Sequence, residues 1–259
     1  MLFTAENAKA IVSTLRDHFE SHGCIPLVCD PVCVSVSGDA LLQSDAVSTM
    51  IEELFPLSQV ITPNQAEAEL LLKARSLPCK ITSLADMLVA AQNLLTLGSE
   101  AVLLKGGRVI VSEDEIRNLQ APDGVELDIK PAFLLGENME VLDYGGTSVV
   151  GDLVVDVLCR RGVKTITVYH RPRLQTKSTH GTGCTLSAAL ACALGNGITS
   201  EQFLPILSWG FSFSYVAVEE AIVQATAFTH LGIETAPPIG KGYGPLNHLH
   251  PVSKLVIQP

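Results

Sequence analysis

The sequence predicts an α/β fold with a mainly parallel central sheet, and two observations carry that prediction. Short runs rich in valine and isoleucine alternate along the 259 residues with segments of helical periodicity. This order is typical of a parallel sheet covered by helices on both faces. With 47% hydrophobic residues, the chain can also bury a sizeable core. We expect a single domain over residues 1–259.

The expected elements follow one another with short connections. Strand-like runs lie at 25–34, 58–64, 100–107 and 164–170. Helical patterns lie at 4–20, 44–55, 64–73, 83–97, 184–195 and 201–228. Residues 108–150 show no clear period and carry many acids and several glycines, so we interpret them as a surface insertion. Ligands of such sheets bind at the carboxyl ends of the strands, which directs attention to Asp30, Asn64 and Lys105.

Composition limits the classes of partner. The net charge of −10 argues against nucleic acid or an anionic membrane surface, because both require basic patches. No apolar run approaches the roughly 20 residues of a membrane helix, and the N-terminus MLFTAENAKA lacks the layout of a signal peptide. Seven cysteines, an odd number, form no disulfide framework in a chain of this length. We expect a cytoplasmic protein with reduced thiols.

The stretch STHGTGCTLSAALACALGNG, at 178–197, predicts an anion site. Gly181, Thr182, Gly183 and Cys184 stand where an alanine-rich amphipathic helix begins. The first turn of a helix leaves backbone N–H groups without intrahelical partners and carries a partial positive charge. We therefore expect something anionic to bind there.

Taken singly, these signals have structural interpretations that remain open. THGTGCT is also compatible with a loop and a buried cysteine at a helix start, NQAE with an N-cap, and LLKGG with a strand end and a solvated lysine. The sequence contains no Walker P-loop and no G-x-G-x-x-G after a strand. His248 and His250 have no third ligand for a metal, and Cys24, Cys29 and Cys33 lack zinc-site spacing.

In combination and order, the motifs resemble one family, the hydroxymethylpyrimidine/phosphomethylpyrimidine kinases of the ribokinase-like superfamily. The resemblance rests on DPVCVSVSGDALL (30–42), VITPNQAEAELL (60–71), AVLLKGG (101–107), STHGTGCTLSAALACAL (178–194) and GYGPLNHLHP (242–251). It implies a three-layer α/β/α fold and a kinase of thiamine biosynthesis. That kinase would use ATP and Mg²⁺ on a small pyrimidine, and the resemblance also points to a possible homodimer.

The resemblance also implies roles for individual residues. Gly181 to Cys184 would form an anion hole for the transferring phosphoryl group, with Cys184 as the base. A thiol at a helix N-terminus has a pKa of roughly 3.5 to 7.5. Thr179, Asn64, Glu67 and Lys105 would bind the nucleotide. Asp30 and Glu67 would lie at the metal, and Asp30 and Val32 at the substrate. Cys33 departs from the methionine usual in the family, which loosens the pocket modestly.

The resemblance begins part-way into the family pattern. Met1 aligns roughly a third of the way in, so the first strand, a glycine-rich turn and a pyrimidine-reading glutamine of the family have no counterpart here. We expect an incomplete gene product or a shortened paralogue with missing N-terminal strands, exposed strand edges and a tendency to aggregate. Two alternative functions stay open: a pyridoxal or pyridoxamine kinase, and a non-catalytic paralogue that retains only nucleotide binding.

Overall fold

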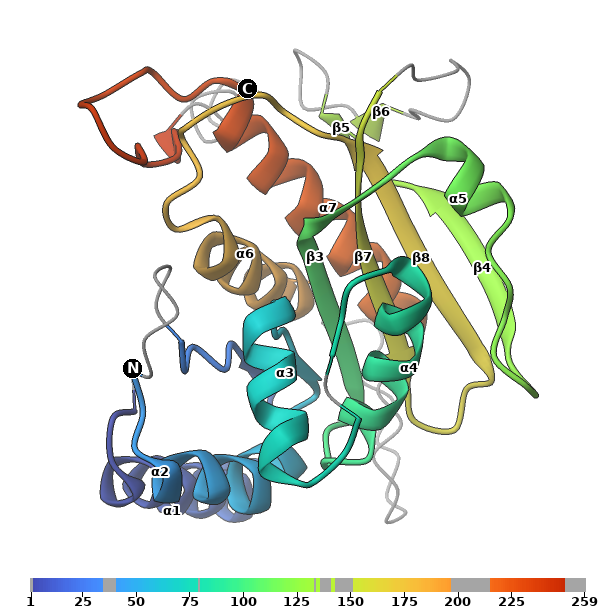
Figure 1. Cartoon of the computed structure of the whole chain (residues 1–259). Helices are drawn as coiled ribbons and strands as arrows, with labels where there is room; N and C mark the ends of the chain where they lie inside the picture. Colours follow the sequence, from blue (N-terminus) through green and yellow to red (C-terminus); the bar gives the residue numbers. More distant parts are fainter. Residues whose placement is uncertain are drawn as a thin grey trace. The chain divides into compact units, whose positions relative to one another are not determined.

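A six-stranded sheet organises the larger part of the described fold (Figure 1). In spatial order its strands are β1 (Val28–Cys29), β2 (Val60–Ile61), β3 (Ala101–Val111), β7 (Leu153–Arg160), β8 (Thr165–Pro172) and β4 (Glu126–Pro131). β1, β2 and β3 pair in parallel, whereas β7 pairs antiparallel with β3 and β8 antiparallel with β7. The structure is a computed structural model that describes residues 2–34, 41–78, 80–132, 134–135, 141–142, 151–196 and 215–249.

The chain divides into two compact units. The first comprises residues 1–130 and 148–173 and contains almost all of this sheet. The second comprises residues 131–147 and 174–259. It contains the antiparallel pair β5 (Leu134–Leu135) and β6 (Val141–Leu142), and the helices α6 (Thr182–Asn196) and α7 (Tyr215–Glu234), which pack against each other.

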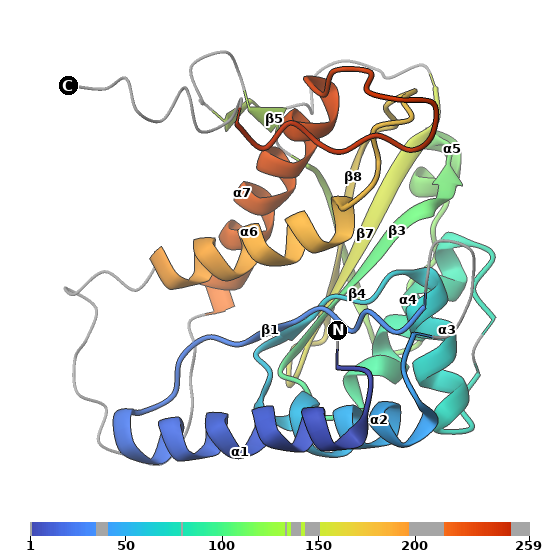
Figure 2. The same ribbon diagram turned by 90° about the vertical axis from the view of Figure 1, so that its left-hand side faces the viewer.

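The helices of the first unit fall into two groups. α1 (Ala5–His22) runs beside α2 (Ser44–Thr49), as Figure 2 shows. α2 continues into a π-helical turn, η1 (Met50–Leu54), and a 3₁₀ turn, η2 (Phe55–Leu57). α3 (Gln65–Ala74) and α4 (Leu84–Leu95) pack on β3, while α5 (Glu113–Arg117) follows β3 directly.

Polar residues fix where three of these helices begin. Asn64, Ser83 and Ser112 are the N-caps of α3, α4 and α5. In each case the cap side chain accepts a hydrogen bond from the backbone of the third helical residue, whose own carboxylate accepts one from the cap backbone. These capping boxes satisfy N–H groups that a helix start leaves without partners.

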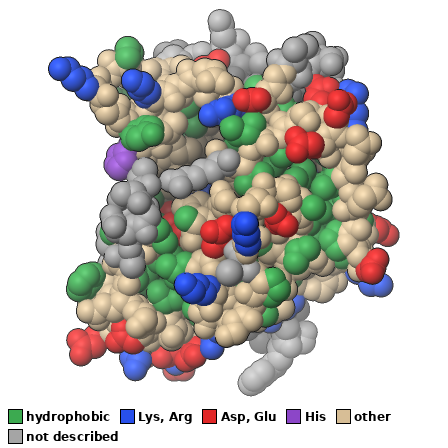
Figure 3. Space-filling model, in the orientation of Figure 1, with side chains coloured by type: hydrophobic (Ala, Val, Ile, Leu, Met, Phe, Trp, Pro, Cys, Tyr) green, Lys and Arg blue, Asp and Glu red, His purple; other side chains and the backbone are tan. Residues whose placement is uncertain are grey.

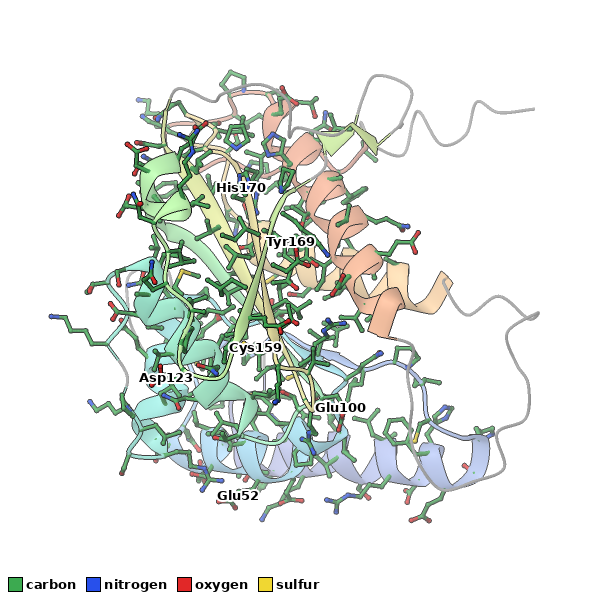
Figure 4. All side chains as sticks on the ribbon, turned by 90° about the vertical axis from the view of Figure 1, so that its right-hand side faces the viewer. Glu52, Glu100, Asp123, Cys159, Tyr169 and His170 are labelled. Atoms are coloured by element: carbon green, nitrogen blue, oxygen red, sulfur yellow. The ribbon has the colours of Figure 1, made fainter. Side chains whose placement is uncertain are left out.

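The core of the first unit lies between its helices and the sheet. Buried side chains from α3, α4, β3, β7 and β8 form one contiguous cluster. Cys159 on β7 and Tyr169 on β8 are buried, whereas Glu52 and Asp123 at the periphery are exposed (Figure 4). Along the edge formed by α1 and α2, acidic and basic side chains lie next to each other (Figure 3). Arg16 of α1 forms an ion pair with Glu53 of η1.

The predicted α/β class is confirmed, and most predicted elements are present within two or three residues of their expected ends. Two differences stand out. The strand predicted at 100–107 continues to Val111, and β7 was not predicted at all. Within 108–150, α5 and β4 are regular elements, and β4 belongs to the main sheet. Of the helix predicted at 201–228, residues 201–214 lie outside the described part of the chain.

Across the described residues, no helix combines the length and apolar character needed to cross a membrane.

Candidate active site

An ion pair in the first unit links a residue at the end of one strand to a residue in the middle of another. Asp30 follows β1 directly, and its Oδ1 lies 2.9 Å from the Nζ of Lys105 on β3. The two side chains are only 15% and 10% exposed. The Thr62 hydroxyl, just after β2, donates to the same Asp30 oxygen at 3.4 Å. Three neighbouring strands thus deliver polar groups to one place, as expected where parallel strands end.

Glu67 lies buried beside this pair. Its Oε2 accepts a hydrogen bond of 2.8 Å from the Asn64 backbone N–H, and its own N–H donates to Asn64 Oδ1 at 3.0 Å. Asn64 also forms a parallel bridge with Lys105. Burial raises the pKa of Glu67; the Asn64 N–H and the charge of Lys105 oppose that shift, while the charge of Asp30 adds to it. A positive charge bound nearby would therefore stabilise the ionised form of the Glu67 carboxylate.

The donor set fits a hard divalent cation that carries phosphate ligands. Mg²⁺ typically takes one or two carboxylates and fills its remaining positions with water and phosphate oxygens. Asp30 and Glu67 supply two carboxylates, and Lys105 supplies a positive charge for phosphate. Among the described residues, no group of three or more His, Cys, Asp or Glu could hold a metal ion. The two carboxylates and the lysine fit a metal–nucleotide complex, in which phosphate and water oxygens complete the coordination.

The glycine turn of the second unit precedes α6 as the sequence predicts. Gly181 has φ of +86°, a conformation that favours glycine, and Thr182 is the first helical residue. The Thr182 hydroxyl donates to Thr179 O at 2.9 Å, and Thr185 N donates to Gly181 O at 2.9 Å. Cys184, in the first turn, is exposed. The helix thus presents its N-terminal turn and a thiol together.

A segment close to the C-terminus supports this turn. His180 N donates to Gly244 O at 3.1 Å, and Gly244 N donates to Lys177 O at 3.0 Å. A Cβ on Gly244 would lie 3.1 Å from Ser178 Oγ, so the two backbones approach closely. His248 Nε2 lies 2.8 Å from Thr185 Oγ1 in the first turn of α6. This contact of His248, which the sequence offered only as a candidate metal ligand, was not predicted.

The sequence profile of the phosphomethylpyrimidine kinase family matches residues 1–139 and 134–203. The chain belongs to this family. A hydroxymethylpyrimidine/phosphomethylpyrimidine kinase of Rhizobium meliloti is 33% identical over 225 residues, which cover 86% of this chain and 60% of the relative. The thiamine biosynthesis bifunctional protein ThiED of Geobacter sulfurreducens is 31% identical over 252 residues, which cover 96% of this chain and 37% of that protein.

Solved structures show the fold. The pyridoxal kinase from Staphylococcus aureus in complex with AMP-PCP and pyridoxal gives a TM-score of 0.62 at 22% identity, covering 96% of this chain and 65% of that one. The pyridoxal kinase of Bacillus subtilis, in an ADP complex, gives 0.62 at 22% identity. The predicted ribokinase-like fold is therefore confirmed. This member of the phosphomethylpyrimidine kinase family spans about 60% of the R. meliloti relative's length.

The structure groups the predicted site residues by unit. Asp30, Asn64, Glu67 and Lys105 come together in the first unit. Val32 is half-buried, with its N–H donating to Asp30 O at 2.8 Å, and its neighbour Cys33 is buried. The remaining predicted residues, which lie on the second unit, are Thr179, Gly181, Thr182, Gly183 and Cys184. Their roles in binding and catalysis remain predictions.

Sequence reasoning missed Thr62 and Asp156. Thr62 stands directly before PNQAE and was included in the quoted motif without a role. Asp156 is 2% exposed on β7 and lies opposite Lys105 in register. One signal was available for it: a single carboxylate inside the apolar run LVVDVLC is costly to bury unless it has partners.

Proposed function

We propose that this chain transfers a phosphoryl group from ATP to hydroxymethylpyrimidine, and then to its monophosphate, in thiamine biosynthesis. The observation that carries the proposal is the Asp30–Lys105 ion pair beside buried Glu67, next to the ends of the parallel strands β1 and β2. Family membership and the printed names of the relatives support this reaction over other phosphoryl transfers. A homodimer, implied by the resemblance, is part of the proposal.

In the first unit, the proposed roles follow from charge. Lys105 would offset negative charge on phosphate oxygens, and its ion pair with Asp30 orients the ammonium before phosphate binds. Asp30 and Glu67 would hold Mg²⁺, the second through water or directly. When bound, ATP with Mg²⁺ supplies the phosphoryl group and part of the charge compensation. The protein's part is to position these groups and keep their charges in place.

In the second unit, the proposed roles follow from the helix start. The N–H groups of the first turn of α6, with Gly181 in its positive-φ conformation, would stabilise charge on phosphoryl oxygens. Thr179 and Thr182 would line this turn. Cys184 is exposed at the helix start, and a thiol there ionises more easily than elsewhere. As a thiolate it would accept the proton of the substrate hydroxymethyl group.

A substrate comparison tests the proposal. The purified chain is incubated with MgATP and either hydroxymethylpyrimidine or pyridoxal, and kcat/KM is measured for each. We expect the pyrimidine to be preferred. Faster phosphorylation of pyridoxal would instead assign the chain to pyridoxal kinase activity. MgATP binding without turnover on either substrate would identify a non-catalytic paralogue.

A further inference from the structure

A second buried acid, Asp156, stands next to Lys105. It lies on β7, which pairs with β3 on the side away from β2. Asp156 on β7 is 2% exposed, and its Oδ2 lies 2.6 Å from Arg171 Nη1 on β8. Its Oδ1 accepts a hydrogen bond of 3.1 Å from the Gly106 backbone N–H. A buried carboxylate requires partners of this kind, and here one of them is the backbone of the residue after Lys105.

The strand pairing explains why Asp156 reaches this backbone. Lys105 and Asp156 are directly opposed in the antiparallel pairing of β3 with β7, and the next paired residues are Ile110 and Val154. The register shift between them makes β3 bulge immediately after Lys105. Gly106 begins the bulge, and a Cβ there would collide with the carbonyl oxygen of Val155. The Asp156 carboxylate therefore binds the first N–H group of an irregular segment.

The same arrangement decides which acid Lys105 contacts. Residues directly opposed across two antiparallel strands have side chains on one face, so Lys105 and Asp156 start out as neighbours. The Asp156 carboxylate is paired with Arg171, and the Lys105 ammonium contacts Asp30 instead. On its other side, the Lys105 backbone is held by its N–H donating to Pro63 O at 2.8 Å.

We propose that Asp156 and Arg171 are a positioning pair for Lys105. Asp156 fixes the backbone after Lys105 through Gly106, and Arg171 neutralises Asp156 so that the lysine ammonium remains with Asp30. Neither residue is proposed to contact nucleotide or substrate. The inference rests on the proposed function for its kinetic consequence, but the placement of the Lys105 ammonium can be measured without turnover.

A variant cycle with Lys105 provides the kinetic test. Asp156→Ala removes the acceptor for the Gly106 N–H, and Arg171→Gln leaves the Asp156 carboxylate able to attract Lys105. We expect each to lower kcat/KM for phosphoryl transfer by about 10²-fold, the cost typical of a misplaced catalytic group. In a Lys105→Met background the same changes should add no further loss. Equal losses in both backgrounds would overturn the proposal.

The matched control is Asp152→Asn. Asp152 precedes β7, and its Oδ2 lies 3.2 Å from Arg173 Nη1 just after β8, so it forms a similar cross-strand pair beyond the Lys105 position. We expect this variant to keep full activity. Each single variant leaves one buried charge without its partner, so the double variant Asp156→Asn/Arg171→Gln is measured as well. It keeps an oxygen for the Gly106 N–H and offers Lys105 no competing charge, so we expect it to regain most of the activity that Arg171→Gln loses. Activity as low as that of Arg171→Gln would overturn the proposal.

The second readout is the ¹³Cε resonance of Lys105 in protein labelled on lysine, assigned by its loss in Lys105→Met. We expect it to shift in Asp30→Asn, in Arg171→Gln and in Asp156→Ala, and to stay unchanged in Asp152→Asn. An unchanged resonance in the Arg171 and Asp156 variants would overturn the inference whether or not the chain is active. A shifted resonance in a chain without kinase turnover would uphold the positioning role while the proposed function fails.

Discussion

Lys105 and Asp30, 75 positions apart in the sequence, form an ion pair with 2.9 Å between Nζ and Oδ1. Both side chains are mostly buried, so each depends on the other for charge compensation. The pair lies between the end of β1 and the middle of β3, next to the capping box that Asn64 and Glu67 form. In our proposal, the role of these buried charges is to bind a metal–phosphate group.

Lys105→Met separates the functional from the structural part of this ion pair. The variant leaves Asp30 uncompensated, so we expect a loss of about 1–3 kcal/mol in the free energy of unfolding and a loss of about 10²–10³-fold in kcat. The double variant Lys105→Met/Asp30→Asn should regain much of the stability and none of the activity. Urea unfolding and steady-state kinetics measure the two effects; a double variant that regains activity would contradict the assignment.

Glu67→Gln should change stability in a pH-dependent way. Burial raises the pKa of Glu67 in the folded state above its value in the unfolded chain. The stability that the protonated side chain contributes is complete below the unfolded pKa of about 4.3 and is lost as pH rises through the folded pKa. Glutamine carries no charge to desolvate and still offers an oxygen to Asn64 N–H.

We therefore expect Glu67→Gln to gain stability relative to the unmodified chain as pH rises from 4 to 8. Urea unfolding of both proteins at several pH values gives this difference directly. Asp86→Asn should show the opposite trend and lose stability relative to the unmodified chain as pH rises, because hydrogen bonds from Thr82 and Ser83 lower the pKa of Asp86. A difference for Glu67→Gln that stays constant over the whole range would show that its carboxylate carries no burial penalty.

Gly181→Ala should damage the turn before α6. A φ of +86° is strained for any residue with a Cβ, at a cost of about 1–2 kcal/mol. Either the turn relaxes and its N–H groups change direction, or the strain persists. We expect weaker MgATP binding, measured by calorimetry. Gly240→Ala is the matched control, since Gly240 has φ of +77° with open space around it, also in the second unit; equal affinity loss in both variants would refute a specific role for the turn.

Nucleotide should protect Cys184 from alkylation. Cys184 and Cys192 are both exposed on α6, one in the first turn and the other further along. Burial raises the pKa values of Cys29, Cys33 and Cys159 to about 12, so these thiols should react only after unfolding. Mass spectrometry of iodoacetamide-treated protein should show that MgATP slows modification of Cys184 and leaves Cys192 unaffected. Equal rates at Cys184 with and without MgATP would place the phosphates elsewhere.

Much of the first unit could be predicted because its signals are local. Alternation of apolar runs with amphipathic segments predicted β1, β2, β3 and β8, and the helical patterns at 64–73 and 83–97 predicted α3 and α4. The position of Asp30, Asn64 and Lys105 after parallel strands predicted that they would meet. That prediction is confirmed by the ion pair and the bridge.

What could not be predicted depends on pairing between distant segments. β7 follows a stretch without a clear period and was not predicted, although its run LVVDVLC is rich in valine and leucine. β3 runs on past the glycines because β7 pairs with it beyond the bulge. The bond of Thr185 to His248 spans 63 positions. No local pattern encodes contacts of this kind.

The most direct test of the proposed function is detection of phosphorylated hydroxymethylpyrimidine by mass spectrometry after incubation of the purified chain with MgATP. Lys105→Met and Cys184→Ala are run in parallel, with Cys192→Ala as the control. We predict product with the unmodified chain and with Cys192→Ala, and product formed about 10²-fold more slowly or less with the other two. Absence of product from the folded, unmodified chain, or equal product from Lys105→Met, would contradict the account.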